Sequence, residues 1–222
     1  MCGRVNQSSK TSVYASLLDA VPVPGIKPRY NLNPTEEITV CRMNGLRKLH
    51  RMRWGLIPHW AKTLKFSYRT HNAISEDVAT SNAYRDAFKR NQRCLIPIDG
   101  YYEWKGAKPP KQPFYIHRSD NKPFALAGFW DHWEGQWEGT ETEIESCTIL
   151  TTNPNSLVGT IHDRTPVVIE EQDYEQWLDP SQNSQDLIGL FELRDYEGFE
   201  AHPISFKLNN PRNDDPSVIE RI

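Results

Sequence analysis

Short runs of alternating apolar and polar residues dominate the chain. This period of two is typical of β-strands that bury one face. Several runs are separated by turn residues, and Asn44-Gly45 is the kind of dipeptide that closes a tight hairpin. The pattern predicts strands at residues 37–43, 46–54, 94–98, 113–117, 123–129, 146–151 and 165–169.

Helical periodicity is less frequent and covers shorter segments. Ser75 before acidic residues is a suitable N-cap, and Asn153 stands before Pro154, a residue favoured at the first helical position. Helices are predicted at residues 11–21, 76–91, 154–161, 170–178 and 185–193. The combination indicates an α+β fold with a mixed, mainly antiparallel, barrel-like sheet and short flanking helices.

We expect one domain over residues 1–222, because 222 residues are too few for two full cores. Segments 106–112 and 135–145 have the composition of surface hairpin loops. The segment from about residue 207 is rich in Asn, Asp and Pro and is expected to be an extended C-terminal tail.

Composition excludes a disordered chain, since 37% of residues are hydrophobic and 11% aromatic. No apolar run approaches the roughly 20 residues of a membrane helix, and the N-terminus lacks the pattern of a signal peptide. A cytoplasmic protein is therefore expected, without a membrane partner. The four cysteines lie far apart with no CxxC pair, so neither disulfides, a structural metal site nor a cofactor is expected.

The net charge of −3 conceals an uneven distribution of charge. Residues 38–75 contain no Asp or Glu, whereas residues 131–200 contain 17. The acid-free segment carries Arg42, Arg47, Lys48, Arg51, Arg53, Lys62, Lys65 and Arg69, interleaved with Trp54, Trp60, Phe66 and Tyr68. Cations and aromatic rings together are typical of a groove for single-stranded nucleic acid, and the alternative is a solvated strand pair with core aromatics.

Cys2 is unusual for its position. Loss of Met1 would place an α-amine and a thiol on neighbouring carbons, with ordinary pKa values of about 7.7–8.0 and about 8.5. An amine condenses with an aldehyde to an imine, and an adjacent thiol can then close on the imine carbon as a thiazolidine. Cys2 is thus a candidate aldehyde trap, unless its place at residue 2 is incidental.

Six motifs occur in order along the chain: Cys2-Gly3-Arg4, Trp54-Gly55-Leu56-Ile57-Pro58 followed by Trp60, Asn72-Ala73 with Glu76, Arg93-Cys94-Leu95-Ile96-Pro97, Asp99-Gly100-Tyr101-Tyr102-Glu103-Trp104 and His162-Asp163-Arg164-Thr165-Pro166. Together they resemble the SOS response-associated peptidase (SRAP) family of abasic-site processing proteins, from Cys2 to about Phe206. The resemblance implies the SRAP fold. It also implies that mature Cys2 crosslinks the ring-opened aldehyde of an abasic site in single-stranded DNA as a thiazolidine, with weak strand-cleaving lyase activity and prior loss of Met1.

The resemblance also assigns roles to individual residues. Glu103 matches the family's catalytic glutamate, His162 the histidine that transfers protons at the sugar, and Asn72 the asparagine that holds the cysteine and the sugar. Without the family, these residues would be an exposed strand carboxylate, a helix cap and a turn residue.

Contacts to the DNA strand are implied for a second set of residues. Ile74 occupies a position where the family commonly has arginine, so one expected phosphate contact is either missing or supplied by Arg69. The expected DNA-binding residues are Arg4, Trp54, Trp60, Arg69, Arg85 and Arg164. A crosslinker that acts on one lesion needs no second subunit, so a monomer is expected.

Two alternatives use the same residues. In the first, Cys2 is the N-terminal nucleophile of an amidohydrolase or peptidase, helped by His162 and Glu103. In the second, the chain is a non-catalytic module that binds modified DNA. A zinc-dependent base deaminase is excluded, because the His-x-Glu and Pro-Cys-x-x-Cys elements do not occur together.

Overall fold

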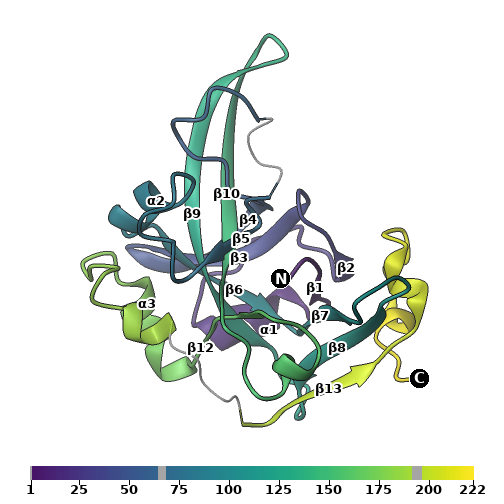
Figure 1. Cartoon of the computed structure of the whole chain (residues 1–222). Coiled ribbons are helices and arrows are strands. Elements are labelled where there is room, and N and C mark those ends of the chain that lie inside the picture. Colours follow the sequence, from purple (N-terminus) through teal and green to yellow (C-terminus); the bar gives the residue numbers. More distant parts are fainter. Residues whose placement is uncertain (1, 65–68, 192–196) are drawn as a thin grey trace.

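The structure is a computed structural model that describes residues 2–64, 69–191 and 197–222 (Figure 1). Several residues named above lie outside the described residues: Met1, Lys65, Phe66, Tyr68 and Leu193 at the end of the last predicted helix. No helix in the described part of the chain is long and apolar enough to cross a membrane.

Five strands close into a barrel. They are β3 (Glu37–Asn44), β4 (Leu46–Trp54), β6 (Arg93–Ile98), β9 (Phe124–Trp137) and β10 (Thr140–Thr152). The order β10-β4-β3-β6-β9 returns to β10, because β9 and β10 also pair with each other. The β4–β10 pair is parallel and the other four pairs are antiparallel, which confirms the mixed, mainly antiparallel barrel. Closure removes the exposed sheet edges among these strands.

Three short strands extend the barrel sheet. β5 (Asn72–Ile74) and β11 (Thr165–Pro166) pair with β10, and β12 (Val168–Ile169) pairs with β9. The predicted strand at 165–169 is therefore two strands, divided at Val167. Its backbone N–H donates to the Leu150 carbonyl, and its carbonyl accepts from Ala127.

A second sheet of five antiparallel strands has the order β13-β8-β7-β1-β2. Its members are β1 (Val5–Gln7), β2 (Arg29–Leu32), β7 (Gly100–Lys105), β8 (Gln112–Arg118) and β13 (Phe199–Pro203). Of these, only β8 was predicted, and β1, β2, β7 and β13 are additions to the predicted set. Residue Asp99 alone separates β6 of the barrel from β7 of this sheet, so the two sheets meet at that point.

The long β9–β10 hairpin projects from the barrel, as Figure 1 shows. Segment 135–145 was predicted as a loop, but the strands continue through it and pair as far as Trp137 and Thr140. Glu138 and Gly139, both with positive φ, form the turn. The Gly-bearing, acidic composition suggested a loop, whereas the alternation of exposed and half-buried residues is compatible with a strand ribbon.

The helices are shorter than predicted. α1 (Thr11–Leu18) ends at Asp19, which has a left-handed φ of 46°. Segment 76–91 forms turns and only the short α2 (Arg85–Lys89).

The three later helices are also reduced. Segment 154–161 contains only the 3-10 helix η2 (Val158–Thr160), whose first turn is capped by the Asn155 side chain and not by Asn153. Segment 170–178 divides into η3 (Glu171–Asp173) and α3 (Tyr174–Leu178), and η4 (Ile188–Phe191) lies within segment 185–193.

The C-terminal segment contains two 3-10 helices, η5 (Phe206–Asn209) and η6 (Pro216–Val218), where an extended tail was expected. Leu208 and Val218 are buried, and the Asp214 carboxylate accepts hydrogen bonds from the backbone N–H groups of Tyr30 and Asn31. The buried Leu208 and Val218 and the Asp214 carboxylate hold the C-terminal segment against β2.

Candidate active site

The candidate site lies where the two sheets meet. Cys2 precedes β1, which pairs with β7, and Tyr102 donates its backbone N–H to the Arg4 carbonyl at 3.1 Å. This antiparallel pairing brings the start of the chain alongside Glu103 on β7. Asn72 begins β5, and His162 follows η2, so both belong to segments around β10.

Cys2 is fully buried in the core cluster that also contains Trp54 and Cys147. Burial raises the pKa of the Cys2 thiol, and the nearby Glu103 carboxylate raises it further. The thiol sulfur lies 3.9 Å from the Arg4 carbonyl oxygen, its weak acceptor. The thiol is therefore protonated at neutral pH, and it requires a proton acceptor to become a nucleophile.

Asn72 fixes the position of Cys2. Its side-chain Nδ2 donates to the Cys2 carbonyl oxygen at 2.7 Å, and Tyr84 donates its hydroxyl to the Asn72 carbonyl at 2.8 Å. The β5–β10 pairing holds Asn72 opposite Ile149. The Asn72 Oδ1 is buried and makes no hydrogen bond within the described residues, so one polar atom of the site remains available for a ligand.

Glu103 is 2% exposed, and burial raises its pKa from an ordinary 4.5 to about 7. One carboxylate oxygen lies 3.7 Å from Nε2 of His162. Burial also lowers the pKa of His162, so the uncharged forms of both groups are favoured. The pair can therefore take up or release protons near neutral pH, which suits general acid and base chemistry.

Two neighbours act on the other ring nitrogen of His162. The backbone N–H of Arg164 donates to Nδ1 at 3.1 Å, whereas a carboxylate oxygen of Asp163 lies 2.8 Å from the same atom. The first contact favours the neutral ring with its proton on Nε2, toward Glu103, and the second favours the imidazolium. Asp163 was not among the predicted site residues, although it is adjacent to His162 in the motif.

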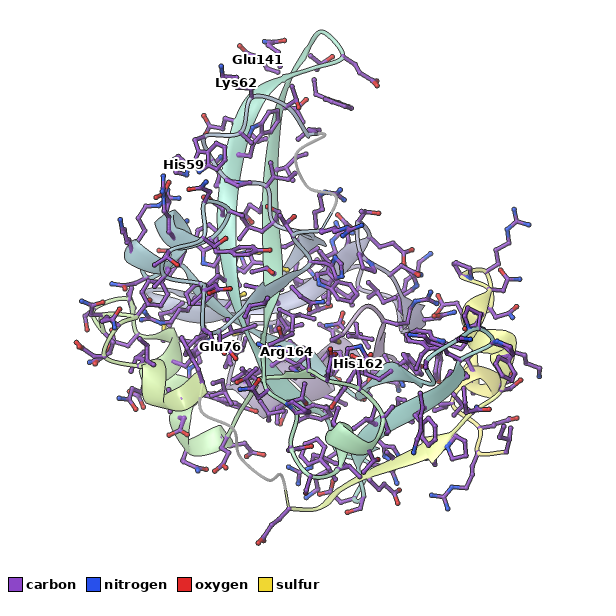
Figure 2. The ribbon with its side chains drawn as sticks, in the orientation of Figure 1. His59, Lys62, Glu76, Glu141, His162 and Arg164 are labelled. Carbon is purple, nitrogen blue, oxygen red and sulfur yellow. The ribbon has the colours of Figure 1, made fainter. Side chains whose placement is uncertain are left out.

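Arg164 forms a bidentate ion pair with the carboxylate of Glu76. Its two terminal nitrogens each lie 2.8 Å from an oxygen of Glu76, and Nη2 also donates to the Thr151 carbonyl at 2.7 Å. This bidentate contact lowers the pKa of Glu76 to about 2. Figure 2 shows Glu76, Arg164 and His162 in neighbouring positions below the barrel. Glu76 stands in an Asn72-Ala73-x-x-Glu76 pattern, but its pairing with Arg164 depends on the tertiary fold.

The remaining predicted DNA contacts differ in their exposure. Trp54 is completely buried, and its indole N–H donates to the His71 carbonyl at 2.8 Å, so its ring offers no exposed face to a base in this structure and its role in DNA binding stays a prediction. Trp60 is 41% exposed, and Arg69 and Arg85 are exposed as well. Arg4 is half-buried, and its Nη1 donates to Asn31 at 2.5 Å and to the Leu208 carbonyl at 2.9 Å.

Part of the predicted basic groove is likewise occupied by internal contacts. Arg42 pairs with Glu145 at 2.6 Å and stacks over Trp130, and Arg51 pairs with Glu37 at 3.3 Å. Acidic partners from other parts of the chain thus neutralise cations of a segment that itself contains none. Lys62 lies on the loop after β4, beside the projecting hairpin that carries Glu141 (Figure 2).

A mixed barrel joined to an antiparallel sheet, with a buried Cys2 beside Asn72, Glu103 and His162, defines the architecture. The family profile described as SOS response associated peptidase (SRAP) matches residues 1–211. The chain therefore belongs to the SOS response-associated peptidase family, whose curated relatives are abasic site processing proteins.

Two such relatives indicate the extent of the similarity. The chain is 34% identical to the abasic site processing protein YoqW of Bacillus subtilis (strain 168), over 99% of both chains. It is 31% identical to the abasic site processing protein HMCES of Xenopus tropicalis, over 88% of this chain and 67% of that protein. A crystal structure of a protein from Bacteroides thetaiotaomicron has the same fold, with a TM-score of 0.87, 25% identity and complete coverage of both chains.

Proposed function

We propose that the chain, once Met1 is removed, traps the ring-opened aldehyde of an abasic site in single-stranded DNA as a thiazolidine on Cys2. The observation that carries this proposal is the position of Cys2: its carbonyl is held by Asn72 at 2.7 Å, beside a buried Glu103 that lies 3.7 Å from His162. Membership in a family of abasic site processing proteins supplies the substrate.

Removal of Met1 is the first chemical requirement. In the full chain the Cys2 nitrogen is an amide, and an amide nitrogen is not nucleophilic. Hydrolysis of the Met1–Cys2 bond consumes one water and releases methionine and a free α-amine. Glu103 is suited to activate that water, because its raised pKa of about 7 makes the carboxylate a stronger base than an ordinary glutamate. The same residues thus support self-processing as well as trapping.

Trapping then proceeds without any oxidant or reductant. The amine attacks the aldehyde carbon to give a carbinolamine, and the hydroxyl leaves as water after protonation by Glu103. The imine carbon that results is attacked by the Cys2 sulfur. The S–H proton passes to the Glu103–His162 pair and the imine nitrogen gains a proton, so the net change is the loss of one water. Because the buried Cys2 thiol is protonated, it is a weak nucleophile until the imine has formed.

A side reaction follows from the same imine. The imine makes the neighbouring sugar proton acidic, and loss of that proton with departure of the 3′ phosphate cuts the strand. We assign to His162, whose Nε2 lies 3.7 Å from Glu103, the proton transfers at the sugar, both for ring opening and for this weak lyase activity. Closure to the thiazolidine removes the imine and so protects the strand.

The strand itself is held by few groups. Trp60 offers an exposed ring on which any base can stack, and Arg69 and Arg85 are exposed cations for phosphates. Arg4 and Arg164, also expected to contact DNA, are held by internal partners and act by positioning the site. A monomer suffices for this chemistry, because all four reactive residues come from one chain. The proposed setting is the cytoplasm, at the nucleoid.

The decisive experiment is a denaturing gel of processed protein, its N-terminal mass confirmed, with single-stranded DNA that carries one abasic site. A heat-stable covalent band is expected for the wild type and is absent for Cys2→Ala and for undamaged DNA. Glu103→Gln is expected to lower the rate at which the crosslinked band forms by about 10²–10⁴-fold, the usual range for general acid–base catalysis. Glu141→Gln on the projecting hairpin is the matched control and is expected to react normally.

The same preparation separates the alternatives. No band from protein that begins at Cys2 overturns the proposal. Turnover of a peptide panel that is lost in Cys2→Ala would then indicate an amidohydrolase. Binding of modified DNA that is unchanged in Cys2→Ala would indicate a module without chemistry.

A further inference from the structure

A cluster of potential metal ligands lies outside the candidate active site, between β8 and β13. His117 lies on β8, and Glu200 and His202 lie on β13. The register pairs Glu200 with His117 and His202 with Tyr115, so the three side chains share one face of the sheet. Figure 1 shows these two strands side by side near the C-terminus. It is the only group of three such side chains in the part of the chain that the structure describes.

The two imidazoles are oriented by the backbone. Nδ1 of His117 lies 2.8 Å from the Arg118 carbonyl oxygen, and Nε2 of His202 lies 3.0 Å from the Ile219 carbonyl oxygen. A carbonyl only accepts, so each of these nitrogens carries the proton. The other nitrogens, Nε2 of His117 and Nδ1 of His202, therefore present lone pairs in the neutral rings, as metal-ligating histidines with an outer backbone partner do.

The facing atoms have the spacing of a coordination sphere. Nε2 of His117 lies 3.4 Å from Nδ1 of His202 and 3.3 Å from a carboxylate oxygen of Glu200. Two zinc–nitrogen bonds of about 2.0–2.1 Å at a tetrahedral angle place the two nitrogens about 3.3–3.4 Å apart. Two lone pairs at this separation repel each other unless a cation or a proton lies between them.

Both imidazoles are buried, which shields their facing nitrogens from bulk water. Glu200 is half exposed and supplies the negative charge. Arg221 approaches the second oxygen of Glu200 at 3.9 Å, which leaves the oxygen that faces His117 available.

We propose that His117, Glu200 and His202 form a binding site for a divalent transition metal such as Zn²⁺, with water as a fourth ligand. The expectation of no metal site considered cysteine spacing alone. These ligands include two histidines 85 residues apart, so only the strand register brings them together. The proposed role of the metal is structural, because it would link β8 to β13. β13 leads into η5, whose Leu208 carbonyl accepts a hydrogen bond from Arg4.

The test is titration of Co²⁺, then Zn²⁺, into tag-free, chelator-stripped protein of the Cys2→Ala variant. The Cys2 substitution removes an aminothiol that could itself bind metal. One equivalent of Co²⁺ is expected to produce the visible bands of a four-coordinate site, and Zn²⁺ is expected to abolish them. Zn²⁺ is also expected to raise the melting temperature, since a ligand that binds only the folded state stabilises it.

Substitutions at the ligands decide the assignment. His202→Gln and Glu200→Gln are each expected to weaken Co²⁺ binding by more than the 10–100-fold typical of an outer-shell change and to abolish the rise in melting temperature. The control is His132→Gln, since His132 pairs with Glu134 at 2.8 Å in a group of two. Absence of Co²⁺ binding, or equal binding by folded Glu200→Gln protein, overturns the proposal. Glu200 is 44% exposed at its side chain, so this variant is expected to fold.

Discussion

At the scale of single residues, Glu103 is buried and lies next to two titratable groups, the Cys2 thiol and the His162 ring. Its carboxyl is 2% exposed and its pKa is raised to about 7, while the Cys2 thiol and the His162 ring are both biased toward their uncharged forms. A charged carboxylate at this place is costly, because burial removes its hydration. Glu103 therefore keeps its proton up to about pH 7, and ionisation above that pH lowers the stability of the folded state.

Glu103→Gln is expected to change how stability depends on pH. The folded-state pKa of about 7 lies above the ordinary 4.5, so the folded state binds more protons than the unfolded state between these values. Stability should then fall as pH rises from about 4.5 to 7, by at most about 3 kcal/mol, and Glu103→Gln should lack this fall. Urea denaturation at pH 5 and pH 8 measures the difference. An equal slope in both proteins would contradict the raised pKa.

At the scale of elements, the end of β4 separates two tryptophans that the sequence does not distinguish. Trp54 is the last residue of the strand and lies within the core, whereas Trp60 lies six positions later on the following loop and is 41% exposed. The alternation along β4 ends with Trp54 at an inward-facing position. The loop that follows carries the ring of Trp60 to the surface. Trp54 thus supports the fold, and Trp60 keeps the proposed role of stacking on a base.

The pair Trp54→Ala and Trp60→Ala tests this division. Trp54→Ala should lower the free energy of unfolding by about 3–5 kcal/mol, since it leaves a cavity and removes the hydrogen bond to His71. Trp60→Ala should change stability little and weaken single-stranded DNA binding by about 1–3 kcal/mol, the value of one stacked base. Chemical denaturation and fluorescence anisotropy give the two quantities. The division is wrong if Trp60→Ala binds DNA as the wild type does.

Prediction from the sequence succeeded where local patterns decide the structure. The alternating strands that close the barrel were predicted, because a period of two needs no tertiary information. The helix predicted at 76–91 is reduced to α2, and Glu76 at its expected start is held by Arg164 from a distant segment. The motif residues could be named from the sequence, and their roles stay predictions. Their geometry, the burial of Trp54 and the engagement of Arg164 depend on contacts between distant segments, which no local pattern contains.

At the scale of the whole molecule, folding partly evens out the uneven charge along the chain. Arg42 and Arg51 have acidic partners, and Arg164 is neutralised by Glu76. Exposed cations that remain among the expected DNA contacts or act on His162 include Arg69, Arg85 and Lys111, although Arg85 also lies 3.7 Å from an Asp86 oxygen. With a net charge of −3, the rest of the surface repels phosphate. The molecule is therefore expected to touch only a short stretch of DNA.

The salt dependence of binding measures this footprint. If three cations neutralise three phosphates, log K for single-stranded DNA should fall with log salt at a slope of about −2, since each phosphate contributes about −0.7. Arg85→Gln should reduce the slope by about 0.7. Lys122→Gln, on the turn between β8 and β9, should leave it unchanged. Anisotropy titrations with an undamaged strand and the Cys2→Ala protein avoid crosslinking during the measurement. A slope of about −4 or steeper would show a larger basic surface than these three residues provide, and a slope near zero would show that stacking on Trp60, not charge, holds the strand.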